Sequence, residues 1–244
     1  MNNNRKIAII VGVLFIIATV VDVVSHSIFI NPLLDDPNYL ISASANQNQL
    51  IAGVILKLIA AFACAGIAIW LYPVLKKHNS ALALGAASFR IIECILYIAA
   101  VIGLLSILTL SQEYVKAGSQ ITSFFPASGS VLLAVREWAG QLAVIAFTVG
   151  AMMYYSVFFQ SKLIPRWLAG WGFLGAALSL VAALLSLSGQ VVPFSTVSIL
   201  LNLPIGVQEM VLALWLIAKG FNPSPVAITS QSTETGTNEL FSMS

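Results

Sequence analysis

The sequence contains few charged residues. Lysine and arginine account for 11 of its 244 residues and aspartate and glutamate for 9, so 8% of the chain is charged, whereas soluble domains average about 25%. Hydrophobic residues make up 59% of the chain. This shortage of charge excludes a soluble domain and predicts an integral membrane protein. No basic surface interleaved with aromatic residues is visible, so we predict no nucleic-acid partner.

Histidine and cysteine are equally scarce, with two of each. Two histidines exclude a multi-histidine zinc or haem site, although a carboxylate-rich metal site that includes His26 stays open. Cys64 and Cys94 are expected about 10 Å apart in depth, too far for a disulfide, and we interpret both as packing residues. The sequence also lacks a nucleophile–base signature and a phosphate-binding loop, so we assign no catalytic residue, metal ligand or cofactor.

Six apolar segments are long enough to cross a bilayer, and they lie at residues 7–29, 50–74, 81–108, 130–158, 167–188 and 197–219. Each is near or above the ~20 residues that span ~30 Å of hydrocarbon as a helix. Backbone in lipid must satisfy its own hydrogen bonds, which leaves helices for segments of this length. We therefore expect an all-α membrane protein with a six-transmembrane-helix bundle at 1–222. The polar 223–244 segment is expected to be a disordered cytoplasmic tail.

The basic residues predict that both termini are cytoplasmic. If the N-terminus is inside, the short inner connections and flanks contain Arg5, Lys6, Lys76, Lys77, Lys162, Arg166 and Lys219. Only Lys116 falls outside, and such a bias sets the orientation of membrane proteins. In the outer connections we expect a short helix from Asn38 to Gln49, with Asp36 as its N-cap, and an interfacial segment at 111–129.

Seven charged residues lie inside the apolar segments, namely Asp22, Lys57, Arg90, Glu93, Arg136, Glu137 and Glu209. An unpaired Asp, Lys or Arg at the bilayer centre costs roughly 2.5–3.5 kcal/mol, so these groups must meet one another, water or a ligand. Helical spacing places three further polar residues on the same faces, His26, Gln141 and Asn202. We take these ten residues as candidate ligand- or proton-binding residues.

Two interpretations of the charged set stay open. Asp22 can pair with Lys57, and either Arg90 or Arg136 can pair with Glu93, Glu137 or Glu209, in which case the ion pairs only organise the bundle. Alternatively, a cavity open to the outside connects Arg90, Glu93 and Glu209, near the midplane, with the other charged residues in the outer half.

Charge balance favours a proton site. Three bases face four acids, so one acid is expected to hold a proton at neutral pH unless His26 supplies the missing charge. We favour Glu209, which follows Pro204 and shares a helix face with Asn202.

The small-residue stripe on the 167–188 helix predicts close packing within the chain in preference to a homo-oligomer interface.

Four strings of residues, Leu71–Asn79, Phe89–Glu93, Pro165–Leu168 and Leu203–Trp215, resemble a bacterial integral-membrane family catalogued as domain of unknown function 4386. The resemblance covers about residues 5–222. It implies a multi-pass protein of the prokaryotic plasma (inner) membrane, and it supplies no activity, substrate or catalytic residue.

Three classes of function fit these residues. We favour binding or transport of a small polar or ionic molecule, with proton coupling, because midplane charges beside a broken helix are typical of transporters. A structural or regulatory membrane subunit is the first alternative. A membrane-embedded enzyme that acts on a lipid, with a glutamate as general acid or base, is the second.

The predicted orientation can be tested by labelling. Cysteines placed at Ser42 and Ser119 should react with an impermeant reagent added to sealed cells, whereas a cysteine at Asn79 should not. Labelling of the Asn79 position from outside would contradict the six-helix order.

Overall fold

The computed structural model describes residues 3–118, 123–191 and 195–222, and within these ranges all regular structure is helical. The helices are α1 (Asn3–Val24), the π-helix η1 (Ser25–Ile30), α2 (Asn31–Leu34), α3 (Tyr39–Ala45), α4 (Gln47–Leu75), α5 (Ser80–Ala117), α6 (Phe124–Ser161), α7 (Arg166–Leu187) and α8 (Thr196–Ala218). The expected tail at 223–244 and the labelling position Ser119 lie outside the described residues.

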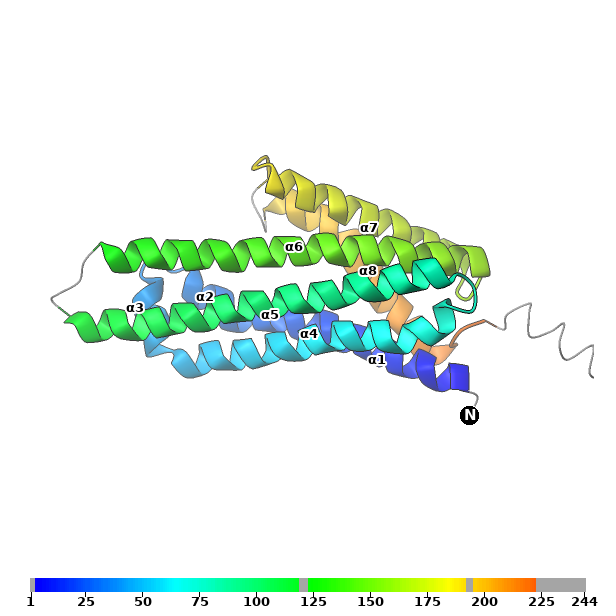
Figure 1. Cartoon of the computed structure of the whole chain (residues 1–244), viewed down its shortest axis with the longest axis horizontal. Coiled ribbons are helices and arrows are strands. Elements are labelled where there is room, and N and C mark those ends of the chain that lie inside the picture. Colours follow the sequence, from blue (N-terminus) through cyan, green and yellow to red (C-terminus); the bar gives the residue numbers. More distant parts are fainter. Residues whose placement is uncertain (1–2, 119–122, 192–194, 223–244) are drawn as a thin grey trace, which may run out of the picture.

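Six helices are long and apolar enough to cross a bilayer, and the first of them runs without interruption from Asn3 through η1 to Leu34. The six expected spans are therefore confirmed, and the chain is a multi-pass membrane protein in contact with lipid. Their order can be followed by colour in Figure 1.

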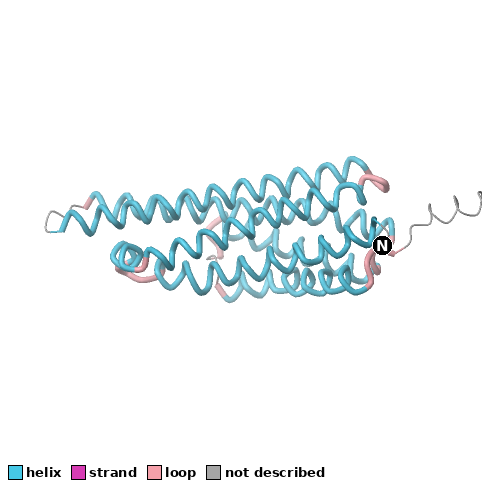
Figure 2. The backbone as a smooth tube through the Cα atoms, turned by 90° about the horizontal axis from the view of Figure 1, so that it is seen from below, coloured by secondary structure: helices cyan, strands magenta, loops and turns pink. Residues whose placement is uncertain are grey.

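The spanning helices form a closed ring in chain order. Each of α1, α4, α5, α6, α7 and α8 packs against its neighbours in this order, and α8 closes the ring against α1. Figure 2 shows the same bundle from below. Phe15, Tyr154, Tyr155 and Phe158 fill much of the interior and are almost fully buried. A ring of this kind gives its members an inner face that is shielded from lipid.

Both ends of the described chain lie at one end of the bundle, which we call the terminal end; the opposite end is the far end (Figure 1). The Arg5 guanidinium on α1 donates hydrogen bonds to the carbonyl oxygens of Leu216 and Ile217, at 3.1 and 2.6 Å. The positive charge of Arg5 is also stabilised by the negative, C-terminal end of the α8 dipole. Which side of the membrane the terminal end faces stays a prediction.

Two helices are longer than the sequence predicts. α5 and α6 have 38 residues each, about 57 Å, whereas α7 has 22 residues, about 33 Å. The expected interfacial segment at 111–129 is therefore mostly helical, because α5 and α6 continue to pack against each other beyond the end of α7. Their shared extension projects at the far end in Figure 1.

The expected outer helix from Asn38 to Gln49 is divided. α3 ends at Ala45 and α4 begins at Gln47, with Asn46 between them. Asp36 accepts hydrogen bonds from the backbone N–H of Asn38, at 2.8 Å, and from the Ser42 hydroxyl. These bonds stabilise the ionised carboxyl and hold the pKa of Asp36 below its usual value.

Close contact between α1 and α8 depends on Gly12. A Cβ atom at Gly12 would lie 2.7 Å from the Ala213 carbonyl oxygen, whereas one at Gly206 would meet nothing within 4 Å. Gly12→Ala should therefore lower the free energy of unfolding by about 1–3 kcal/mol. Gly206→Ala should leave it unchanged or raise it by up to ~1 kcal/mol through helix propensity. Thermal unfolding in detergent would measure both, and equal shifts would contradict the close contact.

Candidate functional site

A buried triad of charged residues lies on the inner face of the ring. Arg90 of α5 places Nη1 3.0 Å from Oε2 of Glu93 and Nη2 3.1 Å from Oε1 of Glu209 on α8. The three side chains are only 4%, 3% and 10% exposed. Arg90 is about 15 Å along α5 from Ser80, near the middle of ~30 Å of hydrocarbon. We call Arg90, Glu93 and Glu209 the triad.

Aromatic side chains surround the guanidinium of the triad. Its central carbon lies 4.6 Å from the Phe147 ring centroid and 5.6 Å from those of Phe15 and Tyr154. Arg90 also donates to the Tyr154 hydroxyl at 3.3 Å. A void beside Arg90 measures about 10 Å³, about the size of a single water site. The three charged side chains are therefore buried and paired with one another.

The triad contains one base and two acids. Glu209 accepts a further hydrogen bond from the Thr19 hydroxyl of α1 at 3.4 Å, and Cys64 of α4 lies beside Glu93. Neither group carries a compensating positive charge. If both carboxyls are ionised, the triad has a net charge of −1.

The Asp22–Lys57 pair, between α1 and α4, is balanced. Lys57 Nζ lies 2.5 Å from Asp22 Oδ1 and 4.2 Å from the centroid of the Tyr97 ring. The two charged side chains are 11% and 30% exposed, Lys57 being the more buried. Lys57 is about 27 Å along α4 from Leu75, which places this pair farther from the terminal end than the triad.

Polar groups continue from α1 into η1 and α2 toward the far end. The Ser25 hydroxyl donates to the Gly53 carbonyl oxygen at 2.7 Å. The π-helix η1 then widens the turn and changes the helical register after Val24. Arg136 of α6 lies 3.5 Å from Nδ1 of His26, within η1, and donates at 3.3 Å to Oδ1 of Asn31, the first residue of α2. The polar groups thus form a ladder from Thr19 to Asn31.

Arg136 and Glu137 lie in the part of α6 toward the far end. Arg136 is 25 residues from Ser161, about 37 Å along α6, which is beyond ~30 Å of hydrocarbon. The side chain of Arg136 is partly buried, and Glu137 is exposed. Arg136 contacts His26 and Asn31, and a cavity that connects it with the triad stays a prediction. α6 itself begins at Phe124, six residues before the predicted span.

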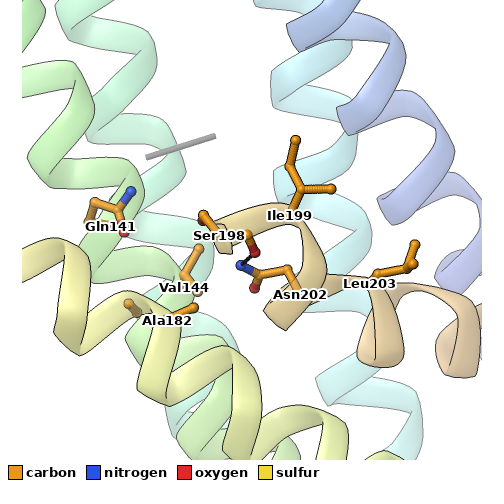
Figure 3. Close-up of a pocket in the computed structure, with 8 residues that line it drawn as sticks. Gln141, Val144, Ala182, Ser198, Ile199, Asn202 and Leu203 are labelled. Carbon is orange, nitrogen blue, oxygen red and sulfur yellow. Dashed lines mark hydrogen bonds between the residues drawn. The ribbon is translucent and has the colours of Figure 1, made fainter. Parts of the chain in front are cut away.

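The two neutral candidates, Gln141 and Asn202, lie in a groove between α6, α7 and α8 with a volume of about 330 Å³ (Figure 3). Asn202 accepts from the Ser179 hydroxyl of α7 and donates to the Ser198 carbonyl oxygen at 2.8 Å. The groove is separate from the triad. We call it the α6–α8 groove.

Sequence reasoning missed Tyr154 and Phe147 as partners of Arg90. The neighbouring Tyr155 hydroxyl donates to the Gln208 side chain on α8. Tyr154 and Phe147 are seven residues apart, and this spacing predicts that they share one face of a helix. In the described ranges no group of three or more histidine, cysteine or acidic side chains is arranged to hold a metal ion.

A family model described as "Domain of unknown function (DUF4386)" matches residues 10–220. The chain belongs to this family. Neither the curated proteins nor the solved structures that were searched gave a match. The family description names no activity, so a function for this member of DUF4386 must be argued from the triad and the α6–α8 groove.

The energetic coupling of the triad can be measured by mutation. Arg90→Ala leaves two buried acids without their base and should lower the free energy of unfolding by about 3–5 kcal/mol. Replacing Glu93 by Gln in the same chain should recover part of this loss. The exposed Lys116–Glu113 pair is the control, because Lys116→Ala should cost no more than about 1 kcal/mol. Purely additive losses in denaturant unfolding would show that the two residues are not coupled.

Proposed function

We propose that this protein binds a small molecule within a bacterial plasma membrane, for storage or transport, and that binding is linked to a proton held by the triad. The observation that supports this proposal is the pairing of one guanidinium with two carboxyls at a buried position. Neighbouring groups do not balance the second carboxyl, whereas the Asp22–Lys57 pair balances itself.

A proton is the smallest ligand that neutralises the triad. A net negative charge in an interior of low dielectric constant is costly, and the void of about 10 Å³ among the aromatic rings around Arg90 leaves room for about one water molecule. A metal ion would need more ligands than two carboxyls that already bind Arg90. One added proton makes the triad neutral and keeps both contacts to the guanidinium, because a protonated carboxyl still accepts hydrogen bonds.

The helix α8 provides a physical link between the triad and the α6–α8 groove. Glu209 and Asn202 are seven residues apart on one face of α8, and Pro204 lies between them. Proline cannot donate to the Leu200 carbonyl oxygen, so α8 is weaker at this position. A change in the contact between Glu209 and Arg90 can therefore alter the position of Asn202, which forms one wall of the groove.

The polar ladder along α1 and η1 supports a proton route from the far end. It brings Thr19, Asp22, Ser25 and His26 into successive positions between the triad and Arg136. Hydroxyl, carboxyl and imidazole groups each exchange protons through hydrogen bonds, and chains of such groups mark proton relays in membranes.

A second candidate function is a structural or regulatory subunit, which the pairing within the triad favours. In that role Arg90 only ties α5 to α8. Buried ion pairs of this kind are weak stabilisers compared with apolar packing but hold helices in register.

The proton-linked function can be tested with Glu209→Gln, which keeps the side-chain shape and removes the surplus acid. The variant should fold and melt like the parent, because Arg90 keeps Glu93 as its ionised partner. In liposomes it should lose any proton flux or pH-dependent ligand binding that the parent shows. Glu113→Gln, at an exposed position, is the matched control and should behave like the parent.

Two results would contradict the proposal. One is a parent protein that takes up no proton and binds nothing in the membrane. The other is a Glu209→Gln variant with the same pH dependence as the parent. Either result would favour the structural candidate.

A further inference from the structure

The α6–α8 groove exists because α8 packs against α7 and α1 but lies apart from the outer part of α6. Its floor consists of Ala182 and Ala183 of α7, whose small side chains leave space above them. Gln141 and Val144 of α6 form one wall, and α8 forms the other, as Figure 3 shows. A volume of about 330 Å³ is at the lower end of the ~300–1,000 Å³ typical of small-molecule sites.

The lining of the groove is apolar with a few neutral polar groups. The residues that line it carry no formal charge. Within the described residues, neither the Gln141 amide nor the Ser198 hydroxyl has a hydrogen-bond partner, and one N–H of Asn202 is unused. These groups offer donors and acceptors to an uncharged polar group, and they offer no counter-charge to an ion.

The depth and surroundings of the groove point to a ligand from the lipid. Asn202 lies about 24 Å along α8 from Ala218, in the far half of the hydrocarbon. Ile199 and Leu203, on the same α8 wall, are 53% and 54% exposed on a surface that faces lipid. Glu137 is exposed one turn beyond Gln141 on α6, and it would repel an anionic headgroup at the mouth.

We infer that the α6–α8 groove binds a neutral amphiphile, an uncharged lipid-like molecule with a hydroxyl or amide head, taken from the leaflet at the far end. The head contacts Gln141, Ser198 and Asn202, and the apolar part lies against Val144, Ala182 and Ala183. This inference names the class of ligand that the proposed function requires. Only the link between that ligand and the proton rests on the proposed function. The binding site itself stands on the groove alone.

The test uses the full-length protein in phosphatidylcholine nanodiscs with a photoreactive long-chain alcohol, and the fatty acid and the alkane of the same chain as competing probes. The alcohol should crosslink to α6 and α8 at the groove at least several-fold more than to other lipid-facing helices. At pH 7 the carboxylate probe and the alkane should label the groove several-fold less. Crosslinked peptides would be mapped by mass spectrometry.

Variants separate the groove from general lipid contact. Ala183→Phe fills the floor and should reduce groove labelling about tenfold, whereas Leu184→Phe, on the exposed side of α7, should leave it unchanged. Ser198→Leu fills the groove from the opposite, less buried wall and should give the same loss if Ala183→Phe does not fold. Gln141→Leu should reduce the preference for the alcohol over the alkane.

Three results would overturn the inference. All lipid-facing helices could be labelled equally, Ser198→Leu could leave groove labelling unchanged, or the groove could prefer the carboxylate probe to the alcohol. The proposed function fails in a different way. Groove labelling that is independent of pH and of Glu209→Gln supports the binding site and contradicts its link to the proton.

Discussion

The contact of one guanidinium with two carboxyls organises the interior of this bundle. Arg90 binds Glu93 on its own helix and Glu209 on α8. In the ring of helices, α5 and α8 are separated by two helices in either direction, so this contact crosses the ring. The triad therefore connects helices that do not pack as neighbours, and the side chains of Phe15, Phe147 and Tyr154 enclose the charge.

Seven of the ten candidate residues lie in two environments. Charged groups lie along the inner faces of α1, α4, α5 and α8, where the triad holds the surplus acid and Asp22 with Lys57 forms a balanced pair. The neutral groups Gln141 and Asn202 lie in the α6–α8 groove instead. This division separates a place for a proton from a place for an uncharged molecule, and α8 is the helix common to both.

Much of the fold could be predicted from the sequence, because bilayer thickness sets the length of apolar helices and the cost of unpaired charge. The six spans are confirmed, and the Asp22–Lys57 and Arg90–Glu93 pairs follow from depth and from a three-residue separation. Helical spacing could not decide whether Arg90 or Arg136 reaches Glu209, because that choice depends on the rotation of whole helices. It also could not show that α5 and α6 continue as helices beyond the expected segments, to 38 residues each.

The proton on the triad can be counted most directly by infrared absorption of the purified protein, which detects the carbonyl band of a protonated buried carboxyl. At neutral pH the parent should show one such band. Glu93→Gln and Glu209→Gln should each abolish it, because one remaining carboxylate balances Arg90 and the proton belongs to the pair. A parent without this band, or a band that persists in both variants, would contradict the account.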